Sequence, residues 1–177
     1  MFNKFHMQHP SNMFVVEYAS RPDLAKIFYE DVLMCAFFYG YPILIENNKY
    51  GIARYFESRG YDGYLMDRPE HLSSASGMKS KTKGIPSNSQ DVIQAHAQAI
   101  ETYIHDHVGI NYDSGLMGKM YFNRTLEDWI GFKIDKRTKF DLTISAGMAL
   151  LAAQKAKPKK KVDFASKKFL RRYRVIG

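Results

Sequence analysis

The chain is poor in cysteine: Cys35 is the one cysteine among its 177 residues. An internal disulfide is therefore excluded, and this composition suits a reducing compartment. No apolar run approaches the roughly 18 residues of a membrane span, and the N-terminal sequence MFNKFHMQHP lacks the apolar core of a signal peptide. We therefore expect one domain, long enough to bury a core and without a membrane partner, in which Cys35 is a packing residue of an apolar helix.

Most of the chain has no excess of positive charge, although the whole chain carries a net charge of +8. From Lys155 onward there are ten Lys or Arg and one acid, Asp163, whereas the first 154 residues hold 16 bases and 17 acids. We predict a flexible start over 1–12, a folded domain over 13–156 and a basic tail over 157–177. The tail is either an electrostatic arm for DNA or another partner, or a disordered solubilising segment.

Strand and helix patterns alternate over the first 66 residues. Residues 13–18 read as a strand, 23–39 as an amphipathic helix, 43–45 as a short buried strand, 48–58 as a second helix and 64–66 as a third strand. This order is the signature of βαβ units, so the predicted fold class is α/β with parallel strands.

The stretch YPILIENNKYG, residues 41–51, holds the first candidate site residue. Glu46 ends the buried strand, and Asn47 and Asn48 follow as helix-capping residues. Open α/β sheets bind their ligands at the carboxyl ends of their strands, which makes Glu46 a ligand or catalytic candidate. The alternative is a solvated Glu at a strand exit.

Residues 68–90 are rich in Ser, Gly, Lys and Pro and show no periodicity. A loop this long in a compact domain is usually functional or disordered. Lys79, Lys81 and Lys83 could hold a phosphate backbone, or the loop could be solvated and bind nothing specific. Ser87 and Gln90 form a plausible capping box for a helix that runs to about residue 106.

The second half of the chain offers a group of polar residues and two residues with a candidate core role. The group is a possible ligand cluster of His105, Asp106, His107 and Asp113. His105 and His107 do not share a helix face, so a metal there is not favoured. The helical pattern makes His96 a residue of the core edge, and Trp129 reads as a core residue rather than a base-stacking platform, on a short helix that Thr125 and Asp128 could cap.

Asp141 begins a helix with a small, apolar inner face, in the sequence KFDLTISAGMALLAA. One account makes Asp141 an N-terminal acid that the helix dipole favours. The other makes it a metal ligand beside the strand end that holds Glu46.

Taken together and in order, several segments resemble the nuclease domain of the large terminase subunit of tailed bacteriophages, a ribonuclease H-like fold. The matching pieces are VVEYASRPD, YEDV, YGYPILIENNKYG, GYDGYL, TKGIPSNSQ and KFDLTISAGMALLAA. Each piece is weak alone, and the ordered set with its Glu-Asn-Asn and Phe-Asp-Leu motifs carries the resemblance. It implies a ribonuclease H-like mixed sheet flanked by helices and covers about residues 13–154.

The resemblance implies a metal-dependent DNA endonuclease that cuts concatemeric viral DNA during packaging. Its clustered carboxylates bind Mg²⁺ or Mn²⁺, usually two ions, and the matching positions here are Glu46 and Asp141, with Lys139 as a possible electrostatic helper. The implied partners are double-stranded viral DNA, the terminase ATPase domain, the small terminase subunit and the portal, at the procapsid in the host cytoplasm. The residues proposed to contact DNA are Lys79, Lys81, Lys83, Lys159, Lys160, Lys161, Lys167, Lys168, Arg171 and Arg172.

The chain also departs from the family pattern. No Asp precedes Asp23, and Glu17 lies on a later strand than the family's first catalytic Asp, so we expect the first strands and one ligand to be absent. No GxxxxGK[ST] loop occurs, so the ATPase motor is absent from this sequence. The chain thus resembles a C-terminal fragment or the product of a split gene, with an incomplete site in which Asp67 could substitute. The alternatives are another ribonuclease H-like nuclease, such as a resolvase, or a non-catalytic module that binds DNA or the portal.

Overall fold

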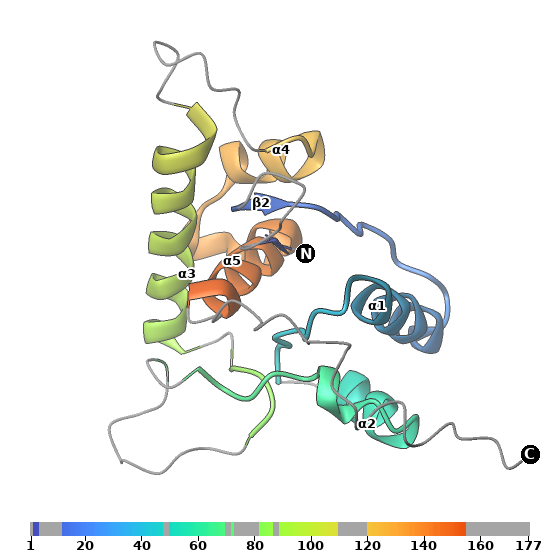
Figure 1. The fold of residues 1–177 in the computed structure, drawn as a ribbon. Helices are drawn as coiled ribbons and strands as arrows, with labels where there is room; N and C mark the ends of the chain where they lie inside the picture. The colour runs from blue at the N-terminus through green and yellow to red at the C-terminus, as the bar shows by residue number, and fades with distance from the viewer. Residues whose placement is uncertain are drawn as a thin grey trace, which may run out of the picture.

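The computed structural model describes residues 2–3, 12–47, 50–69, 72, 82–86, 89–109 and 120–154. Helices dominate this part of the chain (Figure 1). The α-helices are α1 (Ala25–Tyr39), α2 (Gly51–Ser58), α3 (Gln90–Tyr103), α4 (Asn123–Gly131) and α5 (Asp141–Gln154). Shorter helical turns are η1 (Asp62–Tyr64), the π-helical η3 (Ile104–Gly109) and η5 (Ile134–Lys139).

Extended structure is sparse in the described ranges. Strands β1 (Phe2–Asn3) and β2 (Met13–Phe14) pair antiparallel, and three isolated bridges join Ile43 to Leu65, Glu46 to Ile85 and Asp67 to Lys83. The predicted ribonuclease H-like mixed sheet is therefore not supported, whereas helices that alternate with short extended segments are observed.

The strand predicted over 13–18 is shorter in the structure, where β2 ends at Phe14, and later side chains of this segment bond to helices. Glu17 accepts hydrogen bonds from Thr125 on α4, and the Tyr18 hydroxyl donates to Asp31 on α1 at 2.6 Å. These contacts direct the segment toward helix ends rather than toward a neighbouring strand.

The predicted helices are present, with small shifts at their ends. The helix expected over 23–39 is α1, which ends at Gly40 as predicted because this glycine adopts a left-handed φ of 64°. The helix expected from residue 48 begins at Gly51, and α3 begins at Gln90 with Ser89 as its N-cap residue. No helix among the described residues is long and apolar enough to cross a membrane.

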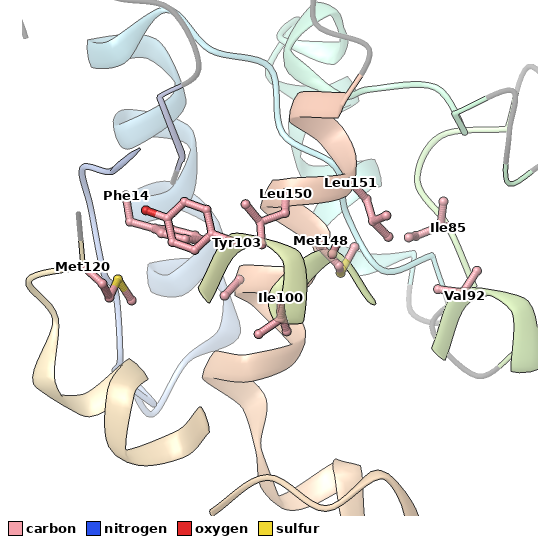
Figure 2. Close-up of a cluster of buried hydrophobic side chains, with 11 residues drawn as sticks. Phe14, Ile85, Val92, Ile100, Tyr103, Met120, Met148, Leu150 and Leu151 are labelled. Carbon is pink, nitrogen blue, oxygen red and sulfur yellow. The ribbon is translucent and has the colours of Figure 1, made fainter. Parts of the chain in front are cut away.

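The described residues bury two apolar clusters. The larger cluster lies between α3, which contributes Ile100 and Tyr103, and α5, which contributes Leu151 (Figure 2). Phe14 of β2 and Ile85 of the segment before α3 complete it. In the smaller cluster, side chains of α1 and α2 cover the extended segments that contain Ile45 and Leu65. The site segment around Glu46 therefore joins the two clusters, since Ile45 belongs to one and its neighbour Ile85 to the other.

Two carboxylates fix the starts of α4 and α5. Glu17 Oε2 accepts from the backbone N–H and the hydroxyl of Thr125, at 3.0 and 2.7 Å. Asp128 Oδ2 accepts from the backbone N–H and the hydroxyl of Thr143, at 2.7 and 2.8 Å. The predicted local capping by Thr125 and Asp128 is therefore wrong, because each of these residues bonds to a distant partner.

We expect Asp128→Ala to lower the free energy of unfolding by about 1–3 kcal/mol, because the Thr143 hydroxyl, buried with its residue at 1% exposure, would lose its acceptor. Urea denaturation followed by circular dichroism measures this loss. Asp135→Ala, at an exposed position of η5, is the matched control and should change stability little. Equal stabilities for the two variants would show that the Asp128–Thr143 contact contributes nothing.

Candidate functional site

Glu46 lies at the end of a short extended segment, as predicted. Ile43 is bridged in parallel to Leu65, and Glu46 is bridged in parallel to Ile85. The Ile85 N–H donates to the Ile45 carbonyl and the Asn47 N–H donates to the Ile85 carbonyl, both at 3.0 Å. This ladder holds the backbone on both sides of Glu46, while the side chain of Glu46 is exposed.

Gly84 allows the close approach of the two segments that carry this ladder. Its φ is +74°, and a Cβ atom at this position would lie 2.3 Å from the Ile45 carbonyl oxygen. Ordinary L-residues disfavour this φ, and the clash is with backbone, which cannot swing aside. The position of Glu46 therefore depends on a glycine at residue 84.

Gly84→Ala should destabilise the chain by more than about 1 kcal/mol, because it adds both a strained φ and a backbone clash. Hydrogen exchange should also rise at the Ile85 and Asn47 amides, which form the ladder around Glu46. Gly63→Ala is the control, since a Cβ there meets nothing within 4 Å. Unchanged exchange at both amides would mean that the close approach at Gly84 does not hold the site segment.

Asp141 is the first residue of α5, as predicted, and its side chain is 66% exposed. Its Oδ2 atom accepts a hydrogen bond from a guanidinium nitrogen of Arg21 at 2.8 Å, across 120 residues of sequence. The N–H of Thr143 in the same helical turn is bonded by Asp128. The first turn of α5 is thus held by Asp128, whereas the carboxylate of Asp141 contacts the guanidinium of Arg21 at the surface.

The described contacts do not join Glu46 and Asp141 to one another. Ile85, the neighbour of Glu46, lies in the same buried cluster as Leu151, which is ten residues beyond Asp141, about 15 Å along α5. In the part of the chain that the structure describes, no three His, Cys, Asp or Glu side chains gather as a metal-binding group. Convergence of Glu46 and Asp141 stays a prediction.

The two carboxylates match Mg²⁺ or Mn²⁺ in chemistry, because both offer exposed oxygen donors on held backbone. In number they fall short of the three or more acids that a two-ion site commonly uses. The chemistry of these two carboxylates therefore suits Mg²⁺ or Mn²⁺, whereas their number does not complete a two-ion site.

Asp67, the predicted substitute ligand, lies in the neighbouring extended segment. Its Oδ1 pairs with Nζ of Lys83 at 3.0 Å, and the same ammonium donates to the Leu65 carbonyl at 3.0 Å. This pair joins two segments that are separate in sequence, since Asp67 and Lys83 are bridged antiparallel. Lys83, a predicted DNA contact, is half-buried in this pair.

The remaining predicted site residues fall into two groups. Lys139 ends η5, two residues before Asp141, and is exposed. The predicted DNA contacts that lie outside the described residues are Lys79, Lys81, Lys159, Lys160, Lys161, Lys167, Lys168, Arg171 and Arg172.

The histidine and tryptophan interpretations have different outcomes. Nδ1 of His105 contacts Asp106 at 3.0 Å, and no three-ligand group forms with them among the described residues, while Asp113 lies outside those residues. Trp129 packs against the larger buried cluster, with its ring 6.1 Å from that of Phe14, which confirms its core role. His96 is buried at 5% exposure, deeper than the core edge at which it was predicted.

Sequence reasoning missed Arg21 at this site. Arg21 and Asp141 are far apart in sequence, and no local spacing pairs them. The available signal was the segment SRPD, which contains Arg21 and belongs to the resemblance, but no role was predicted for this arginine.

Comparisons of the chain with protein-family models, with curated proteins and with solved structures returned no match.

Proposed function

We propose that the chain is a metal-dependent endodeoxyribonuclease module of a viral DNA-packaging terminase large subunit, which cuts concatemeric DNA. The proposal rests on the ordered motifs of the sequence. It places the chain at the procapsid portal in the host cytoplasm, with the ATPase domain, the small terminase subunit and double-stranded DNA as partners.

The structural observation that adds support to these motifs is the environment of Asp141. Asp141 is the first residue of α5, and the Thr143 amide of that turn is bonded by Asp128. The Asp141 carboxylate instead binds a cation at an exposed surface. A carboxylate in that environment can exchange one cation for another, which is what a metal ligand needs.

In such a module, divalent ions bound by carboxylates supply a hydroxide nucleophile and neutralise charge on the phosphate. Glu46 and Asp141 would hold the ions through their oxygens, on backbone fixed by the Ile85 ladder and by the Asp128–Thr143 contact. Lys139 would favour the approach of the phosphate through its positive charge.

Because the ligand set is incomplete, we propose that the 177-residue chain alone cleaves DNA weakly or not at all. Joining it to an upstream segment that carries an Asp on a strand should restore cleavage of plasmid DNA that depends on Mg²⁺ or Mn²⁺. Strong cleavage by the 177-residue chain that both Glu46→Ala and Asp141→Ala abolish would instead mean that an acid such as Asp67 completes the site.

A second candidate is a non-catalytic module that binds DNA or the portal. It is favoured by the pairing of Asp67 with Lys83, which engages the acid that could substitute for the missing ligand. Failure of the extended chain to cleave DNA under any divalent ion would select this candidate.

Removing the basic tail over 157–177 should weaken DNA binding and flatten its salt dependence, because each lost phosphate contact lowers the slope of log K against log salt by about 0.9. Fluorescence anisotropy with a labelled duplex at several salt concentrations measures both effects. The full chain with Asp163→Asn, which keeps all tail bases, should bind at least as tightly as wild type. An unchanged slope after the deletion would remove DNA as the partner of the tail and leave docking to the portal.

A further inference from the structure

We propose that the outward face of α1 is a dimer interface, which pairs antiparallel with the same face of a second copy of this chain. The face consists of Leu24, Ile27, Met34 and Phe38, here called the α1 stripe. α1 lies on the side of the molecule opposite α3 (Figure 1). The inference goes beyond the proposed function, which assigns no role to α1, and does not depend on it.

The helix α1 is apolar on two faces. Leu33 and Ala36 face inward in the smaller buried cluster, at 2% and 0% exposure. Ile27, Met34 and Phe38 share the other face, because they are separated by seven and four residues, and they are 48%, 56% and 81% exposed. A surface helix normally keeps its outer face polar, whereas a helix that is apolar all round is buried. The sequence of α1 therefore fits a helix that is covered on both sides.

The acids of α1 do not oppose burial of the α1 stripe, because each is bonded within its own chain. Oδ2 of Asp31, which shares the outward face, accepts a hydrogen bond from the Tyr18 hydroxyl at 2.6 Å. Glu30 accepts hydrogen bonds from the Tyr55 hydroxyl and, at 3.0 Å, from the guanidinium of Arg59. A second copy that covered this face would therefore leave neither carboxylate buried without a partner.

The exposed area of this face is close to what a dimer needs. A large side chain presents about 200 Å² when fully exposed, so the α1 stripe offers roughly 500 Å² of mostly apolar surface. Phe37, which is 57% exposed, and Tyr61, whose ring lies 6.3 Å from that of Phe37, extend it to roughly 700 Å². A standard protein interface buries about 800 Å² on each partner, so a second copy of the same face is large enough to cover it.

The charges of α1 favour an antiparallel pair. With the twofold axis midway between Asp31 and Met34, Ile27 of one copy lies opposite Phe38 of the other. Lys26 then lies level with the C-terminal turn of the neighbouring α1, where the chain supplies no base of its own. A cation at a helix C-terminus is stabilised by the helix dipole, whereas a parallel pair would place two Lys26 side chains together at the positive end of the dipole.

The interface can be tested by sedimentation equilibrium of the full chain over a range of concentrations. We expect a wild-type dimer that Phe38→Glu weakens by at least about a hundredfold, because each copy would bury an unpaired carboxylate. Ile130→Glu is the matched control, since Ile130 is an apolar residue of α4 with 88% exposure and lies outside the α1 stripe. This variant should dimerise as wild type does, and thermal melts verify that both variants are folded.

The orientation can be tested by cysteine crosslinking in a Cys35→Ser background. Chains with Ile27→Cys and chains with Phe38→Cys carry tags of different size and are mixed under mild oxidation. The antiparallel pair predicts that the main disulfide joins one variant to the other. Equal or higher yields of disulfides within each variant would overturn the antiparallel arrangement.

Two other results would overturn the second copy as the occupant of this face. One is a wild-type dissociation constant weaker than about 1 mM, with the α1 stripe protected from hydrogen exchange only after an upstream segment is joined to the chain. That result would assign the face to the upstream segment. The other is a dimer that Phe38→Glu leaves intact, which would place the contact on another surface. Neither result bears on the proposed nuclease function, because no step measures DNA binding or cleavage.

Discussion

Replacing Glu46 or Asp141 with alanine is expected to lower Mg²⁺- or Mn²⁺-dependent DNA cleavage by at least about a hundredfold. Divalent ions stabilise the transition state of phosphodiester hydrolysis by several kcal/mol, and each 1.36 kcal/mol corresponds to about a tenfold change in rate. Loss of either carboxylate would weaken the binding of these ions. The measurement is the rate of plasmid nicking by the extended chain, which carries the added Asp-bearing strand, at saturating metal.

Glu57→Ala and Asp135→Ala are the matched controls, since both acids are exposed and lie in other helical elements. They should keep at least about half of the activity. Glu46→Ala and Asp141→Ala should melt within a few degrees of wild type, because both side chains are exposed. Full activity in either variant would remove that residue from the site.

His96 should make the stability of the chain depend on pH. It is 5% exposed, its Nε2 atom has no hydrogen-bond partner among the described residues, and its ring packs against Gly147 of α5. Burial, with a smaller contribution from the positive charge of Arg137, lowers the pKa of His96 from 6.5 to about 4. The folded state therefore keeps this histidine neutral at pH values where the unfolded chain protonates it.

Between pH 6.5 and 4 the unfolded state binds more protons at His96, so the free energy of unfolding should fall as the pH is lowered. The full effect is about 3 kcal/mol, reached below pH 4. Urea denaturation of wild type and His96→Leu at pH 7.5, 5.5 and 4 isolates it, because the variant lacks the titrating group. A difference between the two proteins that stays constant with pH would contradict the lowered pKa.

The small cavity of about 10 Å³ beside His96 is lined by Arg137, Thr143 and other residues. A protonated ring would therefore meet the positive charge of Arg137 without room for several waters, which agrees with the direction of the pKa shift.

The local features of the fold could be predicted from the sequence, because they depend on neighbouring residues. Helical spacing located α1, and Gly40 marked its end through its left-handed backbone. The apolar run before Glu46 and the following asparagines marked a segment that is extended, and Asp141 was correctly placed at the start of a helix.

The parts that the structure does not support, or that the sequence did not reveal, depend on residues far apart in sequence. A βαβ order predicts a parallel sheet only if the extended segments pair over several residues, and here the Ile43–Leu65 and Glu46–Ile85 contacts are single bridges. Thr125 and Asp128 have the spacing of a capping box, yet Glu17 and Thr143 are their partners. Local spacing carries no information on these long-range partners, and the same holds for Arg21 and Asp141.

The central claim is that Glu46 and Asp141 bind the same divalent ions. Its most direct test is an anomalous difference map from crystals soaked in Mn²⁺. We expect a peak about 2.1 Å from a carboxylate oxygen of each residue, or two peaks about 4 Å apart that the two carboxylates share. A map in which the two carboxylates lie on opposite faces, with no peak contacting either of them, would contradict the claim.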